Sequence, residues 1–143
     1  MKTYIKYLSM LTLLSFTSSS CGVMFGGSRY TGLIIADGHP QAQIYIDGNN
    51  VGRWKAIGLY PRGRPLTVEL QQESCEPTAQ TFGKALRVGN FFLSLISWGL
   101  PGIAIDLGTG ASFQPDHKGD SAIEKANDKN FIFTVDYSGC PAE

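Results

Sequence analysis

Histidine, cysteine and charge are all scarce in this chain of 143 residues. It has two histidines and three cysteines, and only 17% of its residues are charged. No run of like charge occurs, which argues against nucleic acid as a partner, because phosphate binding requires a concentrated basic patch. Neither histidine has a second histidine or a cysteine at ligand spacing, so we expect no metal site and no cofactor.

Motifs of nucleophilic and phosphate chemistry are missing as well. No Gly-x-Ser-x-Gly elbow occurs, and residues 108–110 (Gly-Thr-Gly) are not followed by the Gly-Lys-Ser/Thr of a phosphate loop. His117 lies beside Asp116 and near Asp120, which is consistent with solvated loop residues or with a metal-binding loop. His39, which lies beside Pro40, is interpreted as a solvated loop residue. The sequence therefore identifies no catalytic residue.

The N-terminus carries the clearest signal that is present. Residues 1–20 have a basic start with Lys2 and Lys6, a short apolar stretch and the small residues Thr-Ser-Ser-Ser, which is the layout of a secretory signal peptide. We expect this segment to be removed. The remaining 123 residues, with 10 basic and 12 acidic side chains, are enough for one domain, which we place at residues 29–143.

Cys21 directly follows the small residues, and this position resembles the processing site of bacterial lipoproteins. The resemblance implies that Cys21 is lipidated, that residues 21–28 form a lipidated tether, and that the lipid joins the protein to a membrane. Gly22 in place of an aspartate implies the outer membrane, with the domain facing the periplasm. The family has an aliphatic residue where this chain has Ser18. An ordinary cleavable signal with a nearby structural cysteine is the alternative.

Lipid on Cys21 leaves an even pair of cysteines in an oxidising compartment. We therefore predict a disulfide between Cys75 and Cys140, with free thiols as the alternative. Closing a loop of this length stabilises a fold by about 4 kcal/mol in the chain-entropy model.

Short alternating segments separated by turn residues predict a mainly β fold, a small antiparallel β-sandwich. Ala42, Ile44 and Ile46 alternate with polar residues, as in a half-buried strand. The following Asp47-Gly48 step is a strong signal for a hairpin turn. We expect the return strand at residues 51–57. Further strands are expected at residues 30–36, 66–70 and 131–137.

Residues 88–105 contain no charged side chain, and this length approaches that of a transmembrane helix. Asn90 as N-cap, Gly99 as C-terminal cap and the following Pro101 limit the first helix to residues 91–98, about 12 Å long. A bilayer core is about 30 Å thick, so this helix cannot cross it. We expect a short apolar helical hairpin, inserted in the sandwich at about residues 88–110.

Two locations of this hairpin are open. It covers an open face of the sandwich, or its aromatic residues Phe91, Phe92 and Trp98 form an interaction surface for the lipid interface or a partner protein. Asp106 lies in the apolar stretch, where burial is costly without hydrogen bonds, so we expect it to brace the turn that ends at Gly110. Further on, capping-box spacing predicts a short helix at residues 122–127.

Two stretches resemble a known family. Residues 40–52 (Pro-Gln-Ala-Gln-Ile-Tyr-Ile-Asp-Gly-Asn-Asn-Val-Gly) look like the core of a PEGA domain, a small β-rich envelope module. Residues 98–110 are similar to the apolar segment that closes many small PEGA-type lipoproteins. The resemblance implies an extracytoplasmic β-module with no established catalytic residues. The chain departs from the pattern at residues 53–55, where Arg-Trp-Lys replaces the usual Thr-Pro, and the pattern does not require the two predicted disulfide cysteines.

Two classes of function follow. We favour a non-enzymatic, envelope-anchored lipoprotein that acts as a structural or protein-interaction module, with an envelope protein as partner. The alternative is a small periplasmic hydrolase or ligand-binding protein that acts on cell-envelope material, with Asp106, Asp116 or His117 in a cleft. Substitution of these side chains without loss of phenotype or stability would eliminate the alternative.

Overall fold

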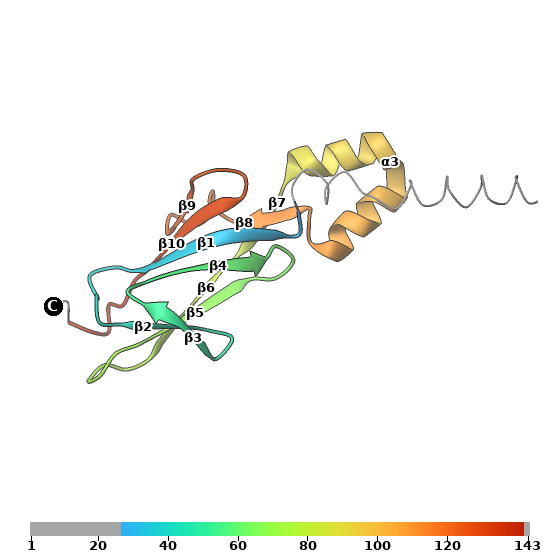
Figure 1. The fold of residues 1–143 in the computed structure, drawn as a ribbon. Helices are drawn as coiled ribbons and strands as arrows, with labels where there is room; N and C mark the ends of the chain where they lie inside the picture. Colours follow the sequence, from blue (N-terminus) through green and yellow to red (C-terminus); the bar gives the residue numbers. More distant parts are fainter. Residues whose placement is uncertain (1–26, 142–143) are drawn as a thin grey trace, which may run out of the picture.

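The computed structural model describes residues 27–141 (Figure 1). The signal peptide, Cys21 and most of the expected tether lie outside the described residues. The predicted mainly β fold with an inserted helical hairpin is confirmed. The elements in chain order are β1 (Arg29–Ala36), β2 (Gln43–Ile46), β3 (Asn49–Arg53), β4 (Lys55–Pro61), β5 (Leu66–Gln71), β6 (Thr78–Phe82), β7 (Lys84–Leu86), α3 (Val88–Thr109), β8 (Phe113–Pro115), β9 (Ile123–Lys125) and β10 (Asn130–Val135).

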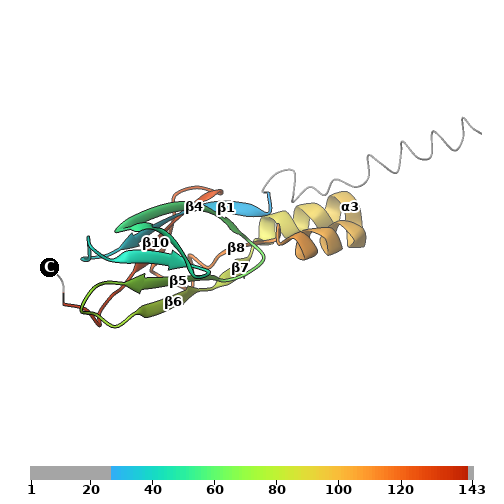
Figure 2. The ribbon, with the colours of Figure 1, turned by 60° about the horizontal axis from the view of Figure 1, so that its bottom comes forward.

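Eight of the strands form one sheet that folds over into two layers (Figure 2). The strand order is β6-β5-β2-β3-β4-β1-β10-β9, and β3 is joined to β4 only by the pair Arg53↔Lys55. Trp54 between them has a positive φ of 64°, and its N–H donates to the carbonyl oxygen of Ala42 at 2.9 Å. The sheet turns its corner here, so the expected return strand at 51–57 is divided into two strands.

The core lies between the two layers. Alternate residues of β1 and β5 point inward and are buried, as the period of two of a β-strand requires. Aromatic side chains fill the middle of the core. The rings of Phe82 and Phe133 meet edge to face at 5.0 Å between centroids, and those of Tyr30 and Phe131 at 5.5 Å. Such pairs add about 0.5–1.5 kcal/mol beyond the burial of their area.

The predicted antiparallel pairing holds for every described strand pair except one. β1 pairs with β10 in parallel, with Ile34 opposite Phe133. The helix expected at residues 122–127 is wrong, because this segment contains strand β9, paired with β10. Ile123 is buried in the core there. Burying this side chain contributes about 1.5–3 kcal/mol, more than a capping box provides on a short segment.

The α3 hairpin does not cover a face of the sandwich. It extends past β7 and β8 and projects from one end of the molecule (Figures 1 and 2). The C-terminal end of the described chain lies at the opposite end of the sandwich (Figure 1). Within residues 27–141 no helix has the length and apolar character needed to cross a membrane. Because the hairpin projects from the end of the molecule, the first of its two expected locations, the face of the sandwich, is ruled out.

Candidate functional site

Most of the exposed large apolar side chains of the described residues are on α3. In the first arm the large side chains of Phe92, Leu93, Leu95 and Ile96 are all exposed, and in the second arm so are those of Leu100, Ile105 and Leu107. Exposure is highest around the bend, with Ile96 at 82% and Leu100 at 80%. Exposed apolar side chains that gather in this way mark an interaction site.

The bend of the hairpin follows from two residues. Gly99 has φ 63° and ψ −147°, a conformation that glycine adopts at little cost, and it interrupts the helical geometry of α3. Pro101 comes two residues later and has no N–H to continue the helix. The predicted break at Gly99 is confirmed. The helix begins earlier than expected, at Val88, directly after Arg87, whose N–H donates to the carbonyl oxygen of Ser112 at 2.7 Å and joins the two ends of the hairpin.

The base of the hairpin is fixed against the turn between β4 and β5. Gly110 caps α3 with φ 79°, and its N–H donates to the carbonyl oxygen of Leu107. A Cβ atom at Gly110 would lie 2.5 Å from Cα of Gly63, so the two backbones touch. Lys84 in β7 donates a hydrogen bond from Nζ to the carbonyl oxygen of Gly63, which ties the stem to the same turn.

Arg62 connects this base to the rest of the domain and is only 1% exposed. Its guanidinium donates from Nη2 to the carbonyl oxygen of Asp128 at 2.7 Å, from Nε to that of Arg29 at 3.3 Å, and from Nη1 to that of Phe113 at 3.4 Å. Its backbone N–H donates to the carbonyl oxygen of Ser28 at 2.9 Å. Arg62 thus joins the start of the domain, the hairpin stem and the β9–β10 turn.

Burial changes the acid–base properties of this cluster. Desolvation, followed by the nearby charge of Arg87, lowers the pKa of the Arg62 guanidinium to about 10. Desolvation, followed by the neighbouring phenol of Tyr60, raises the pKa of Tyr30 well above its ordinary value. Burial also lowers the pKa of Arg87, with partial compensation from Asp128. A buried arginine in a turn between two prolines has no local sequence signal, and our sequence analysis missed Arg62.

A pocket of about 460 Å³ lies beside the first turn of α3. Its charged lining has both signs: Arg87, Asp116, Lys118, Lys125 and Asp128, with His117 between them. Lys125 and Asp128 form an ion pair at 2.6 Å. The described residues contain no group of three or more His, Cys, Asp or Glu side chains that is able to hold a metal ion.

The candidate acidic and histidine residues do not all converge on this pocket. Asp116 and His117 line it, but Asp106 is fully buried at the end of α3 and is absent from its lining. Asp116 accepts a hydrogen bond from the N–H of Gly119 at 3.0 Å, so its carboxylate is part of a turn. The carbonyl oxygen of Asp106 lies 3.4 Å from Oγ1 of Thr109, within the expected turn.

The aromatic residues expected to form an interaction surface differ in exposure. Phe92 is exposed and Phe91 is half-buried, with the two rings edge to face at 6.0 Å. The side chain of Trp98 lies outside the described part of the molecule. Ile96 and Leu100 near the bend, which the sequence analysis did not single out, are more exposed than Phe91 and Phe92. The sequence feature that could have identified these aliphatic residues is the absence of charged residues on both sides of Gly99.

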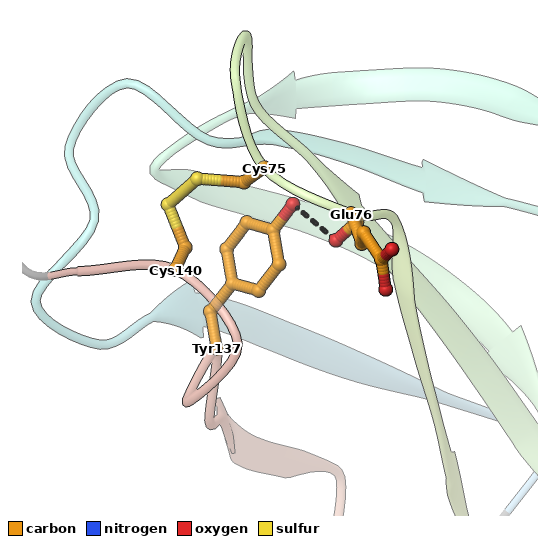
Figure 3. Close-up of a disulfide and its surroundings, with 4 residues drawn as sticks. All are labelled: Cys75, Glu76, Tyr137 and Cys140. Atoms are coloured by element: carbon orange, nitrogen blue, oxygen red, sulfur yellow. Dashed lines mark hydrogen bonds between the residues drawn. A yellow bond between two sulfur atoms is a disulfide. The ribbon is translucent and has the colours of Figure 1, made fainter.

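The predicted disulfide between Cys75 and Cys140 is confirmed, with 5.3 Å between the two Cα atoms (Figure 3). It ties the loop between β5 and β6 to the C-terminal segment. Next to it the hydroxyl of Tyr137 donates to the carbonyl oxygen of Glu76 at 2.8 Å (Figure 3). The disulfide therefore closes the end of the sandwich that lies away from the hairpin.

Two further placements concern the turns. Asp47 and Gly48 form the turn between β2 and β3, both with positive φ, where the sequence placed them. His39 is not a solvated loop residue: it is 5% exposed, and its ring meets that of Tyr137 at 5.2 Å.

A separate polar groove of about 720 Å³, lined in part by Gln43, Arg53 and Glu73, runs beside the disulfide.

Neither a protein-family model nor a curated protein nor a solved structure matches this chain.

Proposed function

We propose that this protein is a non-enzymatic lipoprotein of the bacterial envelope, anchored by lipid on Cys21 and acting as a structural or protein-interaction module. In this proposal the domain is PEGA-like, the anchor lies in the outer membrane, and the sandwich faces the periplasm. An envelope component covers the hairpin.

The observation that carries the proposal is the exposed apolar surface of α3 on a firmly held base. A helix that is apolar without an opposing charged face is normally buried. Here the large side chains of both arms are exposed, while the base is fixed through Gly110 and Arg62. An element that is held rigidly and left uncovered is suited to meeting another molecule.

The disulfide supports the proposed location of the domain in the periplasm. Structural disulfides persist in oxidising environments such as the periplasm, and the pair Cys75–Cys140 leaves Cys21 as the one cysteine of the sequence outside it. A cysteine directly after a signal-like segment is the position that lipidation requires.

Two experiments test the proposal. Metabolic labelling with palmitate is expected to label the wild-type chain in the envelope fraction and to leave the Cys21→Ala variant unlabelled. Crosslinking in the native envelope, followed by affinity capture, is expected to recover a defined complex. A wild-type chain that carries no lipid and yields no complex would refute the proposal.

The pocket beside α3 favours a second candidate, a ligand-binding or hydrolytic protein acting on cell-envelope material. Arg87, Asp116 and His117 line this pocket together. The variants Asp116→Asn and His117→Ala test it, with the free energy of unfolding as a control. If both variants keep the wild-type phenotype and stability, this candidate is eliminated.

A further inference from the structure

We propose that the α3 hairpin inserts its bend into the interfacial region of the lipid bilayer, and that the membrane it enters is the one to which Cys21 is attached. This inference rests on the proposed function, because the lipid anchor defines which membrane is near. It assigns the exposed apolar surface to phospholipid rather than to a protein or a second copy of the chain.

The exposed apolar side chains are spread broadly over the first arm of α3. In the first arm Phe92, Leu93, Leu95 and Ile96 are exposed at neighbouring positions, so the apolar surface is broader than a single stripe. A helix that docks in a protein groove presents anchors at spacings of three and four, beside charged residues. No charged residue occurs in residues 88–105. A surface that is broad, apolar and uncharged fits hydrocarbon better than a shaped protein groove.

The described chain begins close to the base of the hairpin. The carbonyl oxygen of Ser28 accepts the backbone N–H of Arg62, and the next residue, Gly63, touches Gly110 at the base of α3. The start of the domain and the hairpin base therefore lie together. Cys21 lies six positions before Gly27, and this stretch spans at most about 22 Å when extended. A lipid on Cys21 keeps Gly27 within this distance of the membrane surface, and the base of the hairpin lies close to this end of the domain.

The length and direction of the hairpin also suit contact with a membrane. The arm from Val88 to the break at Gly99 rises about 16 Å at 1.5 Å per residue. That is comparable to the distance allowed by the tether, so the bend is able to reach the lipid interface while Cys21 stays attached. Apolar surface at the interface sinks about 5–10 Å into the boundary between headgroups and acyl chains, which is less than the length of the arm. The hairpin points away from the sandwich, so its bend reaches a membrane before any strand does (Figure 1). Ile96 and Leu100, the most exposed apolar residues of α3, are at this leading end.

Charge plays a small part in this contact. The pocket at the hairpin base has three cationic side chains, Arg87, Lys118 and Lys125, and two acidic ones, Asp116 and Asp128. Because these charges nearly balance, attraction to anionic headgroups is weak. Binding to vesicles is therefore expected to change little with ionic strength.

The test uses the chain from residue 21 onward with Cys21→Ser, so that no lipid anchor contributes. Residues 27–141 contain every described strand and the whole core, so this protein retains the fold. Its co-flotation is measured with vesicles of phosphatidylethanolamine and phosphatidylglycerol in a ratio of about 3:1. The proposal predicts that the protein floats with the vesicles. Protein that stays at the bottom of the gradient overturns it.

Matched variants locate the contact. Ile96→Ser with Leu100→Ser is expected to weaken vesicle binding about tenfold or more, because each large aliphatic side chain removed from water changes an equilibrium by about this factor. Ile57→Ser with Leu59→Ser removes comparably exposed side chains, at 73% and 65%, from the outer face of β4 and is expected to leave binding unchanged. The proposal is overturned if both double variants lose vesicle binding equally, or if neither of them loses it.

Sedimentation of the same proteins without vesicles distinguishes the other occupants. A dimer that the hairpin variant converts to monomers, together with absence of flotation, assigns the surface to a second copy and overturns the proposal. These outcomes are independent of palmitate labelling, which tests the anchor. The hairpin assignment and the proposed function can therefore fail separately.

Discussion

Gly110 and Gly63 stand in direct backbone contact, so closely that a Cβ on Gly110 would lie 2.5 Å from Cα of Gly63. One residue ends the hairpin and the other belongs to the turn between β4 and β5. The hairpin therefore points in a defined direction because two glycines allow its base to approach the sandwich. The positive φ of Gly110, 79°, adds a second requirement for glycine at this position.

We predict that Gly110→Ala lowers the free energy of unfolding by about 2–4 kcal/mol, from the strained φ together with the steric overlap. Gly108→Ala is the matched control, since a Cβ there meets nothing within 4 Å and alanine favours a helix. Urea denaturation of both variants measures the difference. Equal stability of the two variants would show that the close approach is unimportant.

Removing the guanidinium of Arg62 is expected to be among the most damaging single changes in the domain. Arg62→Ala leaves three carbonyl groups without their buried donor, and we predict a loss of about 3–5 kcal/mol. Arg64 is the control, because its side chain is 66% exposed and forms only a surface ion pair with Asp47. Arg64→Ala is expected to cost less than about 1 kcal/mol. Thermal and urea unfolding that gave similar losses for both would contradict this account of Arg62.

The disulfide is expected to contribute up to about 4 kcal/mol, because it closes a loop with a sequence separation of 65 residues. Adding a reductant should lower the unfolding midpoint of the wild-type protein. In the double variant Cys75→Ser with Cys140→Ser the midpoint should already be low and should not respond to the reductant. A wild-type midpoint that is indifferent to reduction would argue against a stabilising disulfide.

Alkaline pH should weaken the fold through Tyr30. Its phenol has a raised pKa in the folded state and ionises near pH 10 when unfolded, so above pH 10 the unfolded chain binds fewer protons. The stabilisation is complete below pH 10 and is lost as the pH rises above that value. Arg62, whose pKa is lowered to about 10, acts in the opposite direction over the same range. Arg62 is present in both the wild-type protein and Tyr30→Phe, so the comparison between these two proteins reports on Tyr30.

The comparison is made by urea denaturation at about pH 8 and about pH 11. Relative to wild type, Tyr30→Phe should gain about 1.4 kcal/mol of stability between the two conditions, since one pH unit beyond the unfolded pKa corresponds to this free energy. A constant difference between the two proteins would mean that Tyr30 ionises normally in the folded state.

Local patterns predicted the parts of this fold that depend on local interactions. The alternation in β2 and β5, the turn at Asp47 and Gly48, and the break at Gly99 each follow from residues close in sequence. The cysteine pair was predictable because chemistry and compartment restrict its partners. These features needed no knowledge of which strands meet.

The remaining features depend on partners distant in sequence. The parallel pairing of β1 with β10 joins segments from the two ends of the domain, and strand β9 forms along the edge of β10 that this pairing brings into the sheet. Arg62 is buried because carbonyl groups from three other segments converge on it. The projection of α3 follows from the contact of Gly110 with Gly63, which lies far back in the sequence.

Site-specific photocrosslinking in the native envelope tests the central claim most directly, that the membrane carrying lipidated Cys21 covers the hairpin. A benzophenone side chain at position 96 is compared with one at position 57 on β4. We predict that position 96 gives adducts with phospholipid and that position 57 does not. Adducts of position 96 with an envelope protein or a second copy, and none with phospholipid, would contradict the account.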